Sequence, residues 1–240
     1  MKVTLTIIRY RKRFIPFALL AMAFFRLPLW SSKNIGFFKL MGSGKNGSFD
    51  KTPDWQQWGL LAVQKQDIPG LSGNNSKDMY RLYGAFISKW VKFFNCETWT
   101  VILEPIEGHG RWDTKKVFGE LPQRSAHEGL VAVLTRATIR LSKAKQFWKH
   151  VDAVSRQMAG STGFITSLGI GEIPWIKQAT FSIWQNKEDM MNFAYGMTGH
   201  VEVIRKTRSE KWYSEDMFTR FKLIGSSGTI KGINPLAGKM

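Results

Sequence analysis

The chain has 240 residues, of which 43% are hydrophobic and 22% charged, and this balance excludes a disordered polypeptide. A single cysteine, Cys96, excludes an intrachain disulfide and a metal site built on several thiolates, and it favours an intracellular protein. The net charge of +17 indicates attraction to a polyanion: nucleic acid, an anionic membrane surface or an acidic protein.

The first half of the chain predicts strands and helices in a fixed order. Strand patterns cover 3–8, 36–41, 58–64 and 99–104, and helical patterns cover 14–29 and 76–94. Strand, helix, strand, strand, helix, strand is the order of a ferredoxin-like split βαβ unit. Because 3–8 looks like a strand of the fold, we expect no signal peptide.

The run 14–30 is apolar and follows a basic patch at 9–13. It contains Pro16, Arg26 and Pro28, and its uninterrupted apolar part is about ten residues, whereas a membrane-spanning helix needs about 20. We expect a helix that either packs on the fold or dips into a membrane surface.

The second half of the chain repeats the same order. Strand patterns cover 131–139, 164–168, 179–184 and 218–224. A first helix carries a stripe of Phe147, Val151, Val154 and Met158. Asn186 is expected to cap a long helix from Lys187 to about Tyr213, whose stripe is Met190, Phe193, Ala194, Met197, Val201 and Ile204.

Local matches between the halves indicate an ancient duplication. GFFKLMGSGK at 36–45 resembles GFITSLGIGE at 163–172, and two further segment pairs match in the same order. The predicted fold class is therefore α+β, with two fused ferredoxin-like repeats forming a dimeric α/β-barrel-like architecture within one chain. The predicted boundaries are 1–112 and 130–232 for the repeats, 113–129 for a linker and 233–240 for a tail.

Motifs for hydrolysis or nucleotide binding are missing from the sequence, since there is no nucleophile elbow, P-loop or carboxylate pair at the spacing of an acid–base couple. Four histidines remain as candidates for chemistry. His200 and His150 both fall at the edge of a helical apolar stripe, where an imidazole could serve as an axial haem ligand. On spacing alone, the ordinary interpretation is preferred, that of partly buried histidines that hydrogen bond to a neighbour.

Several segments resemble the spheroidene monooxygenase family. They are VAVLTRATIR at 131–140, GIGEIPWIKQATFSIW at 169–184, WYSEDMFTRF at 212–221, Gly110-Arg111-Trp112 and the glycine-rich segment at 36–44. The resemblance covers about 3–235. It implies a monooxygenase of carotenoid biosynthesis that inserts oxygen at C2 of an acyclic carotenoid such as spheroidene, first as a hydroxyl and then as a ketone.

The resemblance further implies molecular oxygen, reduced ferredoxin and haem iron. We expect His200 as the proximal ligand, with His150 as the second candidate, and Arg136 and Arg140 as aids to haem binding. A lipid-soluble substrate fits a cytoplasmic protein, peripheral on the inner face of the membrane, with no nucleic-acid partner. Two alternatives stay open: a cofactor-free monooxygenase of the antibiotic-biosynthesis type, and a carrier of haem or lipid without catalysis.

Overall fold

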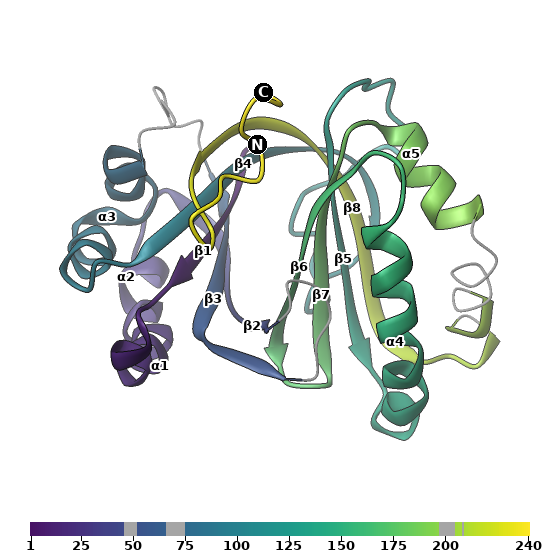
Figure 1. Ribbon diagram of the computed structural model, residues 1–240, viewed down its shortest axis with the longest axis horizontal. Coiled ribbons are helices and arrows are strands. Elements are labelled where there is room, and N and C mark those ends of the chain that lie inside the picture. The colour runs from purple at the N-terminus through teal and green to yellow at the C-terminus, as the bar shows by residue number, and fades with distance from the viewer. Residues whose placement is uncertain (46–51, 66–74, 197–204, 208) are drawn as a thin grey trace. The chain divides into compact units, whose positions relative to one another are not determined.

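A computed structural model describes residues 1–45, 52–65, 75–196, 205–207 and 209–240 (Figure 1). The chain divides into two compact units. Unit 1 comprises Met1–Gly42, Asp54–Glu104 and Leu223–Met240, and unit 2 comprises Ser43–Pro53 and Pro105–Lys222. Two long strands, β4 (Glu97–Gly110) and β8 (Tyr213–Gly228), contribute residues to both units. The boundaries expected from the sequence stay a prediction.

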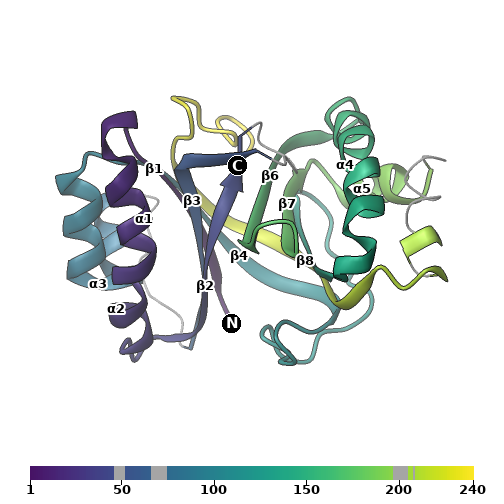
Figure 2. The same ribbon diagram turned by 90° about the horizontal axis from the view of Figure 1, so that it is seen from below.

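Unit 1 consists of a four-stranded sheet with its helices on one face (Figures 1 and 2). Its elements are β1 (Val3–Arg9), a 3-10 turn η1 (Lys12–Phe14), α1 (Ile15–Phe24), α2 (Arg26–Trp30), β2 (Ile35–Gly44), β3 (Pro53–Gln64), α3 (Asn75–Phe93) and β4. The strand order is β4-β1-β3-β2, and β1 pairs antiparallel with both β3 and β4.

Alternation along β1 separates two buried faces of this sheet. Thr4, Thr6 and Ile8 point toward the helices, where both threonine hydroxyls lie within hydrogen-bonding distance of the Tyr83 hydroxyl of α3, at 3.0 and 2.8 Å. Val3, Leu5 and Ile7 point the other way, and their cross-strand partners on β3 and β4 include Val63, Leu61, Leu103, Val101 and Trp99. These eight side chains are all buried and apolar.

Unit 2 repeats the arrangement. Its elements are β5 (Val131–Ile139), a 3-10 turn η2 (Leu141–Lys143), α4 (Ala144–Ala159), β6 (Phe164–Ile173), β7 (Lys177–Trp184), α5 (Lys187–Met191), a π-helical turn η3 (Asn192–Gly196) and β8. The strand order is β6-β7-β5-β8, with antiparallel pairs throughout. Helices α4 and α5 lie on one face (Figure 1).

The two faces of the unit 2 sheet differ in what they bury. Val131 and Val133 of β5 pack among Met158 of α4 and Met190 of α5. By alternation, Ala132 between them and Leu134 and Arg136 after them point to the opposite face. This opposite face is where the only buried charge of β5 lies.

The α+β class and the antiparallel pairing are confirmed, and both units show the predicted order of elements. The apolar stripe of α4 is confirmed at Phe147, Val151 and Met158, all of them buried, and Asn186 accepts a hydrogen bond from the backbone N–H of Asp189 as a helix cap. The arrangement of the two halves as one barrel stays a prediction.

The predicted end of the long helix is wrong. Lys211 takes a left-handed backbone, with φ 51°, and β8 begins at Tyr213, so the chain is extended where the pattern predicted helix. The reason is that Trp212 is fully buried against α4, which requires the chain to turn before it. The stripe members Met197, Val201 and Ile204 lie outside the described residues.

Candidate functional site

Four of the segments that resemble the monooxygenase family, at 110–112, 131–140, 169–184 and 212–221, contribute residues around Arg136 of β5. Arg136 comes from the LTRATIR segment, and only 1% of its side chain is exposed. In register it lies between Ala179 of β7 and Met217 of β8, on the face of the unit 2 sheet opposite the helices. A guanidinium among apolar neighbours is stable only if anions accept its hydrogen bonds.

Three carboxylates surround this guanidinium. Arg136 donates from one terminal nitrogen to Glu215 and from the other to Asp113, at 3.3 Å, and to Glu172, at 3.5 Å. Lys177 donates to the same Asp113 oxygen at 2.7 Å. We name Asp113, Arg136, Glu172, Lys177 and Glu215 the Arg136 cluster. With every group ionised it holds three negative and two positive charges.

The indole of Trp112 completes the enclosure. Its ring centre lies 5.7 Å from the guanidinium carbon of Arg136, and its Nε1 donates to Glu172 at 2.8 Å. The Nε of Arg136 is buried and has no hydrogen-bond partner among the described residues. The guanidinium is therefore oriented by one indole and three carboxylates, with one donor unused.

A tight turn brings Asp113 to the cluster. Asp113 and Thr114 both have left-handed backbones, with φ 48° and 67°, and their backbone N–H groups donate to the carboxylate of Glu215 at 3.1 and 2.7 Å. Just before the turn, Gly110 has φ 88°, and a Cβ at this position would clash with the carbonyl oxygen of Asp216. The glycine lets the turn approach β8.

These donors control the charge of Glu215. Burial alone raises the pKa of Glu215, but the backbone N–H of Thr114 and the Arg136 guanidinium lower it further than burial raises it, and the net pKa lies below 4.5. Glu215 is therefore an anion at neutral pH, and the Arg136 cluster ties the turn at 111–114 to β5, β6, β7 and β8.

Around the cluster the same face of the sheet is apolar. Most cross-strand neighbours on this face are apolar and buried, namely Ala132, Leu134, Phe181, Ile183 and Phe221. Thr219, opposite Leu134, is a buried polar exception. The face therefore matches a hydrocarbon in chemistry, with an oriented ionic group at one end of it.

A second buried carboxylate lies elsewhere in unit 2. Glu107 of β4 is 1% exposed and forms ion pairs with Arg220 of β8 and with Lys187 at the start of α5. It also accepts hydrogen bonds from the backbone and side chain of Ser125. Burial lowers the pKa of Arg220. This group joins the segment before β5 to strands β4 and β8 and to the start of α5.

The predicted haem residues do not all meet. His200 lies outside the described residues. His150 of α4 is half-buried and stacks on Trp212, with ring centres 5.8 Å apart and planes at 22°. The exposed Arg140 binds the backbone of the same segment, because its N–H donates to the carbonyl of Trp212 and its Nε to that of Tyr213. Arg136 lies on the other face of the sheet, away from α4.

The donor chemistry of His150 fits an axial haem ligand. Neither ring nitrogen of His150 has a hydrogen-bond partner within the described part of the chain, so a lone pair is available, and Arg140 beside Trp212 offers a cation. The terminal nitrogens of Arg136, by contrast, already contact carboxylates. No group of three or more metal-binding side chains occurs among the described residues.

Sequence reasoning missed the carboxylates. Glu107, Asp113, Glu172 and Glu215 looked scattered because they are distant along the chain. One signal was present: Arg136 occupies an inward position of a strand whose other inward residues are apolar, and a buried arginine must have an anionic partner.

The fold defines a protein of two α+β units, each with a four-stranded sheet and helices on one face. A search with models of known protein families gave no match. The chain is 32% identical over 229 residues to a spheroidene monooxygenase of Rhodobacter capsulatus, covering 94% of this chain and 91% of that protein. A spheroidene monooxygenase of Rubrivivax gelatinosus is 30% identical over 197 residues, covering 82% and 72%. The chain belongs to the spheroidene monooxygenase family.

A third relative is longer than this chain. The spheroidene monooxygenase of Cereibacter sphaeroides is 33% identical over 201 residues, and the match spans 83% of this chain and 59% of that protein. Among solved structures, an aldoxime dehydratase matches with a TM-score of 0.62 at 8% identity, over 98% of this chain and 86% of that one. At this identity the likeness concerns the fold alone.

Proposed function

We propose that this chain is a monooxygenase of carotenoid biosynthesis. The observation that carries the proposal is the 32% identity over 229 residues to a protein named spheroidene monooxygenase, which extends through both units. The proposed reaction inserts oxygen at C2 of an acyclic carotenoid, first as a hydroxyl and then as a ketone. Molecular oxygen is the proposed oxidant and reduced ferredoxin the proposed electron donor.

The apolar face of the unit 2 sheet is compatible in chemistry with a hydrocarbon substrate. Leu134, Phe181 and Phe221 are fully covered in this structure, so a hydrocarbon would have to replace their present apolar contacts to reach them. The Arg136 cluster is the charged exception on this face. Its proposed role is to hold the turn at 111–114 in place at the end of the apolar surface, without leaving an unpaired charge beside the substrate.

We propose haem as the cofactor, held by His200, with His150 as the second candidate ligand. Haem would supply the oxygen activation that side chains cannot. The contribution of the chain would be to present an imidazole nitrogen to the iron and to orient the substrate. For His150 the indole of Trp212 stacks on the imidazole, and the exposed Arg140 would supply a cation to pair with a carboxylate of the cofactor.

The reaction is tested by producing the chain in a host that accumulates spheroidene. We expect new pigments heavier by one oxygen atom, and keto products, identified by mass spectrometry together with the position of the oxygen. Pigments identical to those of the host without the chain, despite soluble protein and an electron donor, would overturn the proposal.

The cofactor is tested by absorption spectroscopy of the purified protein. We expect a Soret band that His200→Ala abolishes, while His127→Ala leaves it unchanged, because the hydrogen-bond partner of His127 within the described ranges is the carbonyl of Leu130. Loss of the band in His150→Ala instead would assign the ligand to α4. Colourless protein that turns over without an electron donor would favour a cofactor-free monooxygenase, and pigment binding without oxygen consumption would favour a carrier.

A further inference from the structure

The helix pair α1–α2 of unit 1 is apolar on two opposite sides. Ala18, Ala21, Phe25 and Leu29 form one stripe and are buried against the sheet and α3. The opposite side is also apolar, yet it is exposed: Leu20 is 44%, Leu27 71% and Trp30 79% accessible. A surface helix ordinarily has a polar outer face, so this one lacks its covering.

The exposed apolar surface continues onto α3. Phe24 of α1 contacts Trp90 of α3 edge to face, with ring centres 5.9 Å apart, and Phe86 contacts the same indole at 5.9 Å. Phe24, Phe86 and, about two turns further along α3, Phe93 are all exposed. Figure 2 shows α1 and α3 side by side. We name Leu20, Phe24, Leu27, Trp30, Phe86 and Phe93 the apolar ridge.

Cations surround the apolar ridge. Arg11, Lys12 and Arg13 precede α1 and are exposed, and Arg26 is exposed at the junction of α1 and α2. On α3, Lys89 follows Phe86 by three residues and Lys92 immediately precedes Phe93. Together with the net charge of +17, this arrangement repels a second copy of the same surface and attracts an anionic one.

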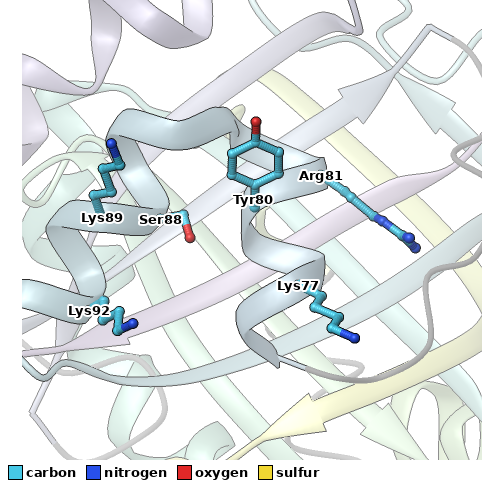
Figure 3. Close-up of a pocket in the computed structure, with 6 residues that line it drawn as sticks. All are labelled: Lys77, Tyr80, Arg81, Ser88, Lys89 and Lys92. Carbon is cyan, nitrogen blue, oxygen red and sulfur yellow. The ribbon is translucent and has the colours of Figure 1, made fainter.

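A basic cavity lies in the same helix layer. α3 is broken at Gly84, where φ is 84° and ψ 177°, and residues from both sides of the break line an open cavity of about 410 Å³. Its lining is Lys77, Tyr80, Arg81, Ser88, Lys89 and Lys92 (Figure 3). Four cations and two hydroxyls are the chemistry that binds a phosphate group.

The helix is better placed to lie on a bilayer than to cross it. Lys12–Trp30 has the length and composition of a membrane-spanning helix, but its inward stripe packs on the sheet of unit 1. To span a membrane it would have to leave that core. An apolar stripe flanked by cations and ending in an exposed Trp is the pattern of a helix that lies in the membrane interface.

We propose that the apolar ridge and the cavity of α3 together dock unit 1 onto an anionic phospholipid bilayer. The ridge inserts among the acyl chains, and the cations contact the lipid phosphates. The physical argument is independent of catalysis, and only its purpose, access to a lipid-dissolved substrate, rests on the proposed function.

Vesicle flotation of the full chain tests the proposal. The probes are vesicles of phosphatidylcholine alone and of phosphatidylcholine with phosphatidylglycerol in equal parts. We expect binding to the anionic vesicles that weakens with added salt, and much weaker binding to the neutral ones. The assay measures vesicle binding and not turnover, so the proposed function can fail while the docking holds. Conversely, a chain that oxygenates carotenoid but does not bind anionic vesicles would refute the docking and leave the proposed function standing.

Paired variants locate the surface. Leu20→Glu with Leu27→Glu should weaken binding by about tenfold or more for each residue, because an apolar insertion is replaced by a charge. The control is Leu141→Glu with Ile233→Glu, which changes the net charge equally at exposed aliphatic residues outside the ridge. Lys89→Glu with Lys92→Glu should weaken binding by about tenfold, against Lys145→Glu with Lys149→Glu on α4 as control.

Three results would overturn the proposal. One is wild-type protein that stays unbound with anionic vesicles. Another is equal weakening in each variant and its control, which would indicate a general charge effect. The third is a stable dimer in sedimentation that Leu27→Glu dissociates, because a second copy would then cover the ridge. Circular dichroism and thermal unfolding check that each variant is folded.

Discussion

Replacing Arg136 by methionine tests how much the Arg136 cluster contributes to stability. The side chain is 1% exposed, and its removal leaves Glu172, which is 13% exposed, and Glu215, which is 22% exposed, without their guanidinium. Asp113 keeps its ion pair with Lys177 and is more exposed, so losing its contact with Arg136 should change the free energy of unfolding little. Breaking a buried ion pair from one side costs about 3–5 kcal/mol. We expect Arg136→Met to lose that much free energy of unfolding at neutral pH.

The measurement is urea unfolding of wild type and variant, with Arg140→Met as the matched control. Arg140 follows the end of β5, is exposed and, among the described residues, donates only to backbone oxygens, so its loss should cost less than about 1 kcal/mol. In the double variant Arg136→Met with Glu215→Gln, the second change should cost less than it does in wild type, with a coupling of about 2 kcal/mol.

The deficit of Arg136→Met should depend on pH in a defined direction. The pKa of Glu215 is lowered in the folded protein, so its stabilising contribution is present above pH 4.5 and is lost as the pH falls below that value. Protonation also removes the uncompensated charges left in the variant, and its deficit should therefore shrink in acid. A variant that unfolds within about 1 kcal/mol of wild type at neutral pH would refute this account of the cluster.

Three further predictions concern the backbone and the buried hydroxyls. Gly110→Ala should lower the free energy of unfolding by about 3 kcal/mol or more, because strain at φ 88° adds to a clash with β8. The control Gly232→Ala, at φ 78° with open space around it, should lower it by about 1 kcal/mol. Equal losses in urea unfolding would count against the close approach of Gly110 to β8. Tyr83→Phe should cost about 1–3 kcal/mol, since it leaves two buried threonine hydroxyls without their common partner, and no loss in thermal or urea unfolding would contradict the hydrogen bonds. Burial raises the pKa of Tyr83 and of Tyr213 to about 12, so the stability that both phenols contribute is intact below pH 10 and is lost as the pH rises toward 12. Circular dichroism along an alkaline titration should therefore show unfolding in that interval. Relative to its own stability at neutral pH, Tyr83→Phe should lose less stability over this interval than the wild type.

The local sequence pattern was sufficient to predict an element where the segment has clear end signals and its apolar residues share one buried face. β5 was predicted at its observed residues, 131–139, because a run of β-branched and apolar residues is bounded by a glycine before it and a charged turn after it. The stripe of α4 was equally readable, since helical spacing places its apolar residues on one face.

The sequence pattern was insufficient to predict strand ends and site residues where a polar side chain is stabilised by a partner distant in the sequence. β4 and β8 extend beyond the predicted 99–104 and 218–224 because their ends carry polar residues, such as Glu107 and Glu215, that read as loop until their cationic partners are known. Arg136 was predicted as a functional residue, but Asp113, Glu172 and Glu215 lie 23, 36 and 79 residues away from it in sequence. Only the sheet register brings them together.

Strands β4 and β8 have a practical consequence for anyone dividing the gene. A fragment ending before 113 would lack Leu223–Met240, which belong to unit 1, and a fragment starting at 130 would lack Pro105–Gly129, which belong to unit 2. Each product would therefore lack part of a compact unit, and residues from both ends of the chain are needed to complete unit 1.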